Sequence, residues 1–289
     1  EFENTKVIGL DRDIESQKVA NSILENFEDR FIFKNLKFSQ LTNLKIKNEN
    51  IKGVLFDLGY SLNQIKDSKK GLSFSSHSEL NMRLGLNDFS AKEVINKLES
   101  KDLQKIFKHF GEEKEAKKIA EKIASFRANY NIDTQDLVNI IDTVKRKKNF
   151  KIHSSTKVFQ AIRMFVNKEI TELINGLIHA TKILKKGGIL AVVSFHSIED
   201  KIVKYFFSNF SKNRSNPSRY LPEDGENKFF LFESYNKKVF KPSRNEIIKN
   251  KPSRSAKLRF AIRSKKGFSY PSNLFQKFEK YLNIEAKNV

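Results

Sequence analysis

The sequence predicts an α/β protein in which a mostly parallel sheet, covered by helices, is interrupted by an inserted segment made of helices alone. Short apolar runs alternate with amphipathic stretches over the first third of the chain, as in parallel strands joined by helices. Residues 91–148 then carry apolar residues at helical spacing and no strand-like run. The 289 residues, 38% of them hydrophobic and 26 of them Phe, suffice for a large domain with a smaller insertion.

Three apolar runs predict the first strands. They cover residues 6–10, 31–33 and 54–56, and residues 13–26 are predicted to form a helix. The first run ends in Asp11 and the third in Asp57. Ligands of parallel sheets bind beyond the carboxyl ends of the strands. We therefore expect both acids at the ligand edge, where they end neighbouring parallel strands.

The next elements follow from changes in composition. Residues 58–90 lack clear periodicity and are rich in Ser, Gly, Asn and Asp, and loops of this length are usually functional. Three helices are predicted in residues 91–148, and one long helix at about 155–185, which ends in two Lys and two Gly. The remaining elements are a buried strand at 189–195, a helix from Ser197 and a strand at 257–262.

These elements divide the chain into three parts. We expect residues 1–88 to form the first part of the main domain and residues 89–150 the helical insertion. Residues 151–289 complete the main domain and carry a basic C-terminal tail.

The charge is strongly positive and unevenly distributed. The net charge is +21, and residues 211–265 hold 15 Lys and Arg against 5 Asp and Glu, about half of the excess. An AT-rich coding bias also enriches Lys, and the chain has 43 Lys against 12 Arg. The clustering favours a docking surface for a polyanion, usually nucleic acid, over a uniform enrichment in Lys that coding bias would produce.

Several classes of protein are disfavoured. The sequence has no Cys, which excludes disulfides and thiolate metal sites, and no apolar run long enough to span a membrane. The five His form no metal-ligand pair, so no metal is predicted, and no P-loop or Gly-x-Ser-x-Gly turn occurs. No secretion leader opens the sequence as given, so we expect a cytoplasmic protein without a membrane partner.

The acids at the strand ends allow two interpretations. Asp11 can accept hydrogen bonds from the hydroxyls of a ribose, or belong to a solvated turn in which Asp13 caps the helix. Asp57 can pair with a cationic or amino-bearing ligand, or form a simple turn with Gly59.

Two further segments carry polar groups suited to recognition. Phe74, Asn81 and Arg83 combine an aromatic ring, an amide and a guanidinium, which suits base stacking and edge recognition. His196 follows Ser194 at the end of the predicted strand 189–195. Ser197, with Asp200 three residues on, is predicted to cap the next helix.

A glycine-rich cofactor loop is expected about 20 residues ahead of a ribose-binding acid. Only ten residues precede Asp11, and the first residue is Glu1, not Met. The pattern predicts that a strand and its Gly loop lie upstream of residue 1, so that the sequence is truncated at its N-terminus.

Seven stretches, in order, carry a family resemblance. They are IGLDRD at 8–13, FDLGYS at 56–61, KGLSF at 70–74, LNMR at 80–83, TKVFQAIR at 156–163, SFHSIEDKIVK at 194–204 and RSAKLR at 254–259. Together they resemble the bacterial RsmH (MraW) type 16S rRNA cytosine-N4 methyltransferases. The resemblance implies a Rossmann-like domain that uses S-adenosyl-L-methionine (SAM), with an inserted helical substrate domain.

The resemblance also implies a substrate and a cofactor site. The substrate is a cytosine in the decoding region of 16S rRNA, in the RNA or the small ribosomal subunit. Asp11 would hold the ribose of SAM and Phe38 would lie near its adenine, while Asp57 and Gln64 would line its far side. Asp57 is the first candidate to accept a hydrogen bond from the target amino group. Ser194 and His196 are weaker candidates near the target.

The sequence departs from the family pattern at three places. The Gly-Gly-His cofactor loop of the family belongs upstream of residue 1, Leu62-Asn63 replaces the usual Ser-Pro, and Asn81 replaces the usual Asp. The alternative is a non-catalytic RNA-binding or ribosome-associated module derived from such an enzyme. A nicotinamide-dependent dehydrogenase is less favoured, because neither the +21 charge nor the 58–83 loop has a role in it.

Overall fold

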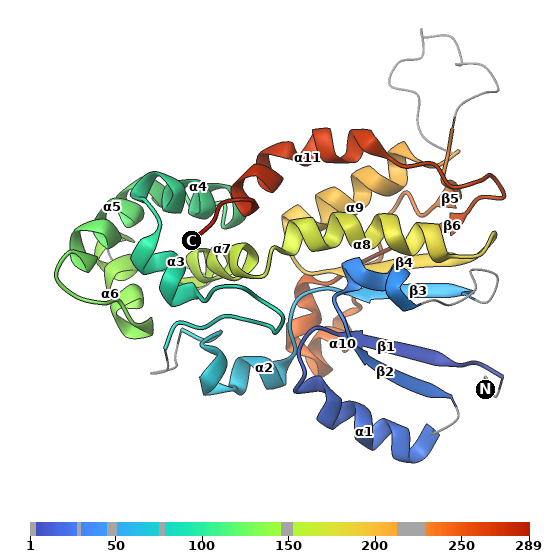
Figure 1. Ribbon diagram of the computed structural model, residues 1–289, viewed down its shortest axis with the longest axis horizontal. Helices are drawn as coiled ribbons and strands as arrows, with labels where there is room; N and C mark the ends of the chain where they lie inside the picture. The colour runs from blue at the N-terminus through green and yellow to red at the C-terminus, as the bar shows by residue number, and fades with distance from the viewer. Residues whose placement is uncertain (1–3, 28–29, 45–50, 75–78, 146–152, 213–228) are drawn as a thin grey trace, which may run out of the picture. The chain divides into compact units, whose positions relative to one another are not determined.

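The computed structural model describes residues 4–27, 30–44, 51–74, 79–145, 153–212 and 229–289 (Figure 1). The chain forms two compact units. The first unit contains Glu1–Lys37, Tyr60–Thr171 and Glu279–Val289, and the second contains Phe38–Gly59 and Glu172–Phe278. None of the described helices combines the length and the apolar character that crossing a lipid bilayer requires.

The first unit begins with a two-stranded parallel sheet. Strands β1 (Val7–Asp11) and β2 (Phe31–Asn35) pair in register from Val7 opposite Phe31 to Asp11 opposite Asn35. Helix α1 (Ser16–Phe27) connects them and lies against β2. The predicted strand–helix–strand order is confirmed, and α1 starts three residues later than predicted because the backbone first turns at Asp13.

The second unit is built on a four-stranded sheet in the order β3-β4-β6-β5. Strands β3 (Gly53–Asp57) and β4 (Ile189–Ser194) are parallel, as predicted. Strand β6 (Lys257–Arg263) confirms the strand predicted at 257–262. Together with β5 (Phe232–Tyr235) it forms an antiparallel half, and neither β5 nor this direction was predicted.

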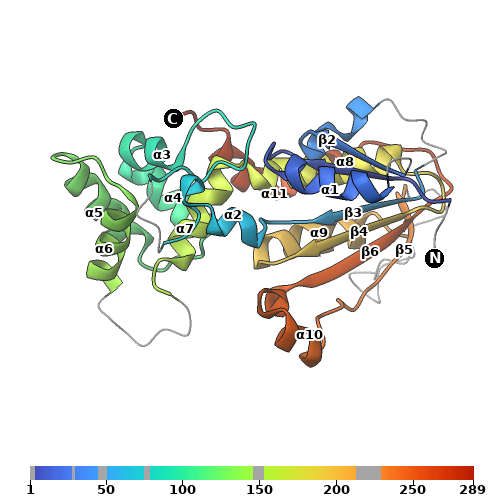
Figure 2. The ribbon, with the colours of Figure 1, turned by 90° about the horizontal axis from the view of Figure 1, so that it is seen from below.

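Helices lie on one face of this sheet and not evenly on both. Helix α9 (Ser197–Asn209) contacts β4, β5 and β6, and α8 (Glu169–Ile183) contacts β3 where Gly176 meets Phe56 (Figure 2). Phe56 is buried, whereas its neighbour Leu55, which points to the other face, is 66% exposed. At β3, the face that carries Leu55 is therefore not covered by a described helix.

The two sheets are separate within the described residues. No ladder of hydrogen bonds joins β1 to β3 there, so Asp11 and Asp57 end strands of different sheets. The expectation that these acids end neighbouring strands of one sheet is thus not met by strand pairing. Each acid does end a strand with a parallel partner, as predicted.

The middle of the chain is helical. Its helices are α3 (Ala91–Lys97), α4 (Ser100–Phe110), α5 (Ala116–Arg127), α6 (Thr134–Lys145) and α7 (Thr156–Val166). Helix α4 packs against α5 and α7, with Leu103, Ile106, Phe107 and Phe110 buried, so the helical spacing identified the core face. No strand occurs in the described part of residues 91–166, and the predicted fold class is confirmed. The division at residues 88 and 150 stays a prediction.

The predicted long helix at 155–185 is two helices. Helix α7 ends at Val166 and α8 begins at Glu169, because Lys168 adopts a left-handed backbone with φ of 48°. Arg163 spans the break with two hydrogen bonds to Glu169, at 2.7 and 3.0 Å. The apolar spacing continues through the break, which is why the sequence predicts one helix.

The C-terminal helix closes the start of α8. Glu285, at the end of α11 (Ser272–Glu285), accepts hydrogen bonds from the backbone N–H groups of Ile170 and Thr171 and from the Thr171 hydroxyl, at 2.6–2.9 Å. Its carboxyl is fully buried, and burial raises its pKa to about 8 despite these three bonds.

We predict that Glu285 makes stability fall as the pH rises. Its folded pKa of about 8 exceeds its unfolded value, so its contribution to stability is complete at low pH and is lost as the pH approaches 8. Relative to Glu285→Gln, the unfolding free energy should fall by up to about 1.4 kcal/mol per pH unit between pH 5 and 8. Urea unfolding across this range measures the slope. Glu279→Gln, at an exposed position of α11, is the control, and parallel curves for wild type and Glu285→Gln would contradict the prediction.

Candidate functional site

Asp57 marks the carboxyl end of the parallel pair β3–β4. It lies opposite Val193 in the ladder, and the N–H of Leu58 donates to the Val193 carbonyl at 3.0 Å, so β3 stays paired up to the turn. Asp57 is partly open to solvent at this edge. Its position is the one expected for a ligand-binding group in such a sheet.

The start of α9 differs from the prediction. His196 caps the helix, and Glu199, three residues on, completes the capping box, in place of the predicted Ser197 and Asp200. Glu199 is buried and accepts from the backbone N–H groups of Phe195 and His196, at 2.9 and 3.3 Å. Asp200 instead binds Arg259 and Lys257 of β6, which explains why it does not cap.

The Glu199 carboxylate therefore acts electrostatically on Asp57 at the end of β3. Partial burial and, second, the negative charge of Glu199 raise the pKa of Asp57 above its ordinary range. The site is thus a local concentration of negative charge in a chain with a net charge of +21. Such a site favours a cationic ligand, which would relieve the repulsion between the two groups.

Phe38 lies in the same unit. It begins the short helix η1 (Phe38–Leu44), and its ring lies 5.3 Å from the Phe56 ring, centroid to centroid. A Cβ at Gly176 of α8 would stand 2.5 Å from the Phe38 ring, so this close packing requires glycine. The ring is half-buried, which leaves part of it accessible.

Ser194 and His196 occupy the end of β4 and the turn after it. Ser194 is 2% exposed and its hydroxyl donates to the Lys257 carbonyl at 3.4 Å, so it is closed off from a substrate. The His196 ring accepts from the Glu199 N–H and lies 3.1 Å from the Glu199 carboxylate, which gives it a capping role.

Asp11, in the first unit, holds the turn after β1. Its two oxygens accept from the Asp13 N–H at 2.7 Å and from the Ser16 hydroxyl at 2.8 Å. Each carboxylate oxygen has two acceptor sites, so both retain one for a ligand hydroxyl.

Gln64 is engaged with its own unit. Its amide nitrogen donates to Asp13 at 2.7 Å, and its oxygen accepts from the Ser61 N–H at the start of α2 (Leu62–Lys66). Asp13 also pairs with Lys70 at 2.7 Å. Burial alone would raise the pKa of Asp13, but the bonds from Lys70 and Gln64 hold it below the ordinary range.

The loop after α2 carries the three predicted recognition residues, all in the first unit. Asn81 accepts from the Arg83 side chain at 2.8 Å and so directs an exposed guanidinium. Asn81 therefore uses its amide oxygen where the family pattern has an Asp. Phe74 stacks on His153 with ring centroids 4.1 Å apart, which partly covers the ring.

A clamp that the sequence did not reveal holds this loop. The buried Asn167 donates to the Met82 carbonyl at 2.8 Å and accepts from the Leu84 N–H at 3.0 Å. Arg12 donates to the carbonyls of Gly85 and Asn167, both at 2.8 Å. The residue after Asp11 thus ties the end of β1 to the loop that carries Arg83.

The backbone conformation of the loop that carries Arg83 allows this close approach of Arg12. Met82, Gly85 and Leu86 have φ values of 55°, 91° and 54°, and a Cβ at Gly85 would meet the Arg12 carbonyl at 2.3 Å. No local signal indicates the clamp, because the apolar spacing continues unbroken past Asn167.

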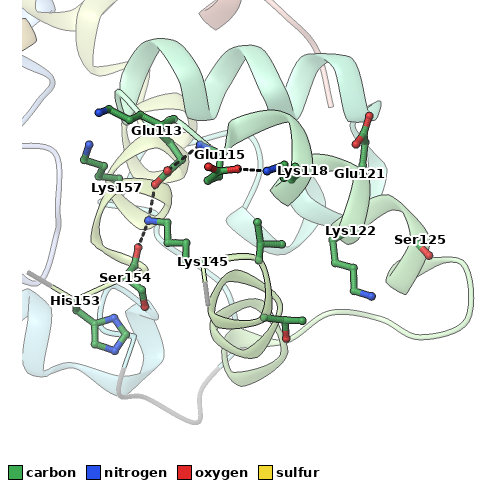
Figure 3. Close-up of a pocket in the computed structure, with 13 residues that line it drawn as sticks. Glu113, Glu115, Lys118, Glu121, Lys122, Ser125, Lys145, His153, Ser154 and Lys157 are labelled. Carbon is green, nitrogen blue, oxygen red and sulfur yellow. Dashed lines mark hydrogen bonds and ion pairs between the residues drawn. The ribbon is translucent and has the colours of Figure 1, made fainter. Parts of the chain in front are cut away.

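A large hollow lies elsewhere, in the helical part of the first unit. It measures about 1020 Å³ and is lined by α5, α6 and residues 153–157 (Figure 3). Its charged groups are partly paired, with Lys145 on Glu113 and Lys118 on Glu115. None of the predicted site residues lines the hollow, although His153, which stacks on Phe74, does. The candidate site therefore stays at the strand ends.

The parallel strand pairs with their connecting helices form the α/β fold of a Rossmann-like methyltransferase. The chain belongs to the MraW methylase family, whose model matches residues 1–264. It is 40% identical over 261 residues to the ribosomal RNA small subunit methyltransferase H of Bartonella grahamii, across 90% of this chain and 77% of that protein. The protein of the same name from Ehrlichia canis is 36% identical over 265 residues, across 90% and 86%.

We predict that Asn167→Ala destabilises the first unit by about 3 kcal/mol, because it leaves the buried N–H of Leu84 and carbonyl of Met82 without partners. Amide exchange at Leu84 should also accelerate. Asn139→Ala, at an exposed position of α6, is the control and should change stability by less than about 0.5 kcal/mol. Equal unfolding midpoints for the two variants would show that the clamp carries no stability.

Proposed function

We propose that this methyltransferase uses SAM to methylate the N4 amino group of a cytosine in the decoding region of 16S rRNA. The observation that carries the proposal is the position of Asp57 at the carboxyl end of the parallel pair β3–β4, where it is accessible to a ligand. The rRNA substrate is supported by relatives that are named ribosomal RNA small subunit methyltransferase H. The basic charge of the chain agrees with an RNA substrate.

The described residues fit SAM in their chemistry. When bound, SAM supplies an electrophilic methyl group on a sulfonium cation, and it also carries an amino group. A site whose own carboxylates repel each other suits such a cation, because the ligand offsets the repulsion. Asp11 retains acceptor capacity for the two ribose hydroxyls.

The remaining cofactor contacts divide into binding and positioning roles. We assign Phe38 to the adenine, since part of its ring is accessible and its position is fixed by Gly176 and Phe56. Gln64 lies beside the cofactor in our proposal, but its bonds to Asp13 and Ser61 make it a positioning residue for the loop that follows Asp57.

Asp57 has the central role in the reaction. The lone pair of cytosine N4 is delocalised into the ring, so the amino group is a poor nucleophile. An ionised Asp57 accepts a hydrogen bond from this amino group, holds it in line with the methyl group and stabilises the positive charge that develops. Orientation of this kind supplies up to about 7–11 kcal/mol in well-aligned reactions.

The target base must leave its stack to reach Asp57, at a cost of about a few kcal/mol. Phe74, Asn81 and Arg83 are the residues that we assign to the RNA. Arg83 is exposed and directed by Asn81, and it offers free N–H groups to a phosphate or a base edge. Ser194 is sealed inside and His196 caps α9, so we give both a positioning role.

We predict that Asp57→Ala lowers kcat for methyl transfer to small ribosomal subunits by about 100-fold or more, because it removes the acceptor for the amino group. Glu233→Gln removes an exposed carboxylate of the same sheet and should leave the rate unchanged. Transfer of a labelled methyl group measures both. Undiminished methylation by Asp57→Ala would remove Asp57 from the mechanism. Calorimetry without SAM binding by the wild type, combined with intact RNA binding, would favour the non-catalytic module.

We predict that methyl transfer requires ionised Asp57 and therefore rises with pH through its elevated pKa. Glu199 contributes to this elevation, so Glu199→Gln should move the acidic limb of the pH–rate profile to lower pH. The glutamine retains an oxygen to accept from the Phe195 N–H. Rates measured from pH 4 upward provide the test, and an acidic limb at the same pH in both proteins would contradict it.

A further inference from the structure

A basic arm connects β5 to β6 in the second unit. It spans residues 236–256 and contains α10 (Arg244–Lys249) and the short helix η4 (Lys251–Ser255). Seven Lys and Arg side chains lie in it against one acid, Glu246, whereas the whole chain has 55 against 34. All seven are exposed, and none has an ion pair or a side-chain hydrogen bond to a described residue.

This arrangement differs from lysines elsewhere in the chain. Lysines of the first unit often pair with acids one helical turn away, such as Lys97 with Glu93 and Lys118 with Glu115. A coding bias toward Lys predicts such mixing throughout. The unpaired charge of the arm leaves a concentrated positive potential that attracts a polyanion.

The arm has a fixed shape. The backbone of Phe240 exchanges two hydrogen bonds with Leu258 of β6, at 3.1 and 2.9 Å, and Asn236 accepts from the Phe260 N–H at 2.6 Å. Ser243 caps α10 through the Glu246 N–H. The cations are therefore presented on ordered backbone, which lowers the entropy cost of binding.

The arm also offers an aromatic surface. Phe240 is 55% exposed, and its ring stacks on Phe260 with centroids 6.1 Å apart and planes 21° apart. A stacked pair with one open face suits an unpaired base, and exposed aromatic rings among cations are typical of single-stranded RNA surfaces.

The arm lies at the same edge of the sheet as Asp57. Because β6 is antiparallel to β4, Lys257, where the arm ends, pairs with Ser194 at the carboxyl end of β4 (Figure 2). Asp57 ends the next strand, β3, so two strand spacings, about 10 Å, separate the two strand ends.

We propose that the basic arm docks the RNA that flanks the target base, with its cations on phosphates and Phe240 under an unpaired base. This inference rests on the proposed function for the identity of the RNA. Two groups of opposite charge lie at one edge of the sheet, and each favours a different ligand. The carboxylates favour a cation, and the arm favours the polyanion. An anionic membrane is the rival partner, but α10 has only six residues, and Ile248 is its one strongly exposed large apolar side chain.

The test compares two triple variants of the full chain. The arm variant is Arg244→Gln with Lys249→Gln and Lys251→Gln. The control is Lys52→Gln with Lys186→Gln and Lys265→Gln, which removes the same charge from exposed lysines beyond the opposite ends of the strands. Binding of labelled single-stranded RNA is measured by fluorescence anisotropy at several salt concentrations.

The arm variant should bind RNA about tenfold or more weakly, and its slope of log K against log salt should fall by about two, as expected for three lost phosphate contacts. KM for small ribosomal subunits should rise similarly at unchanged kcat. The control should change each value less than about twofold. Equal losses in the two variants would overturn the proposal.

Phe240→Ser tests the aromatic contact separately. Stacking releases no counterions, so this variant should lose about fivefold in RNA affinity with an unchanged salt slope. Tyr270→Ser is the control, because Tyr270 is 56% exposed in the same unit and stacks on Phe275. Equal affinity in the two variants would remove Phe240 from the docking surface.

The outcomes separate this inference from the proposed function. If wild type transfers no methyl group to subunits while the arm variant still loses RNA affinity, the docking surface holds and the proposed function fails. If wild type methylates and the arm variant matches the control, the docking surface alone fails. Loss of binding to vesicles with anionic lipid, together with full RNA affinity, would assign the arm to a membrane and overturn the proposal.

Discussion

The position of Asp57 at the carboxyl end of β3, with Glu199 at the start of α9 nearby, is the constraint on which the rest of the site depends. Glu199 is buried because it caps α9, and it accepts the N–H groups of the turn that follows β4. Because of this capping role, the negative charge of Glu199 lies near Asp57, at the point where the parallel strands end. The fold thus brings two acidic side chains to one end of the sheet in a chain with a net charge of +21.

Acidic and basic side chains form two separate groups in the second unit. The carboxylates and the basic arm lie at one edge of the β3-β4-β6-β5 sheet, and the antiparallel β6 is what brings the arm there. Asp200 links the carboxylates to the strand that follows the arm. It lies next to Glu199 in the first turn of α9 and binds Lys257 and Arg259 of β6. Under the proposed function, a cationic cofactor and an anionic RNA would approach one edge without competing for the same side chains.

The strand ends were predictable and the contacts around them were not. Asp11 and Asp57 follow apolar runs, so their places at the ends of β1 and β3 can be read from local sequence. The sequence pattern predicts the cap of α9 one residue late, because Ser197 and Asp200 fit the capping pattern as well as His196 and Glu199 do. The choice is decided by Arg259 of β6, which engages Asp200 from 59 residues away.

The same limit applies to the clamp at Asn167. A helical run of apolar residues predicts one helix from 155 to 185, and nothing local to residue 167 indicates that Met82 and Leu84 need its amide. Long-range hydrogen bonds of this kind override a local pattern because an unpaired buried backbone group costs about 1–3 kcal/mol.

A carbon-13 NMR titration of the Asp57 carboxyl tests the central claim most directly. In the free chain its pKa should lie above the ordinary value for aspartate, and saturation with SAM should lower it, because the sulfonium charge favours the ionised form. S-adenosylhomocysteine, which lacks that charge, should lower it less. An ordinary pKa in the free chain, or no change with either ligand, would contradict the account.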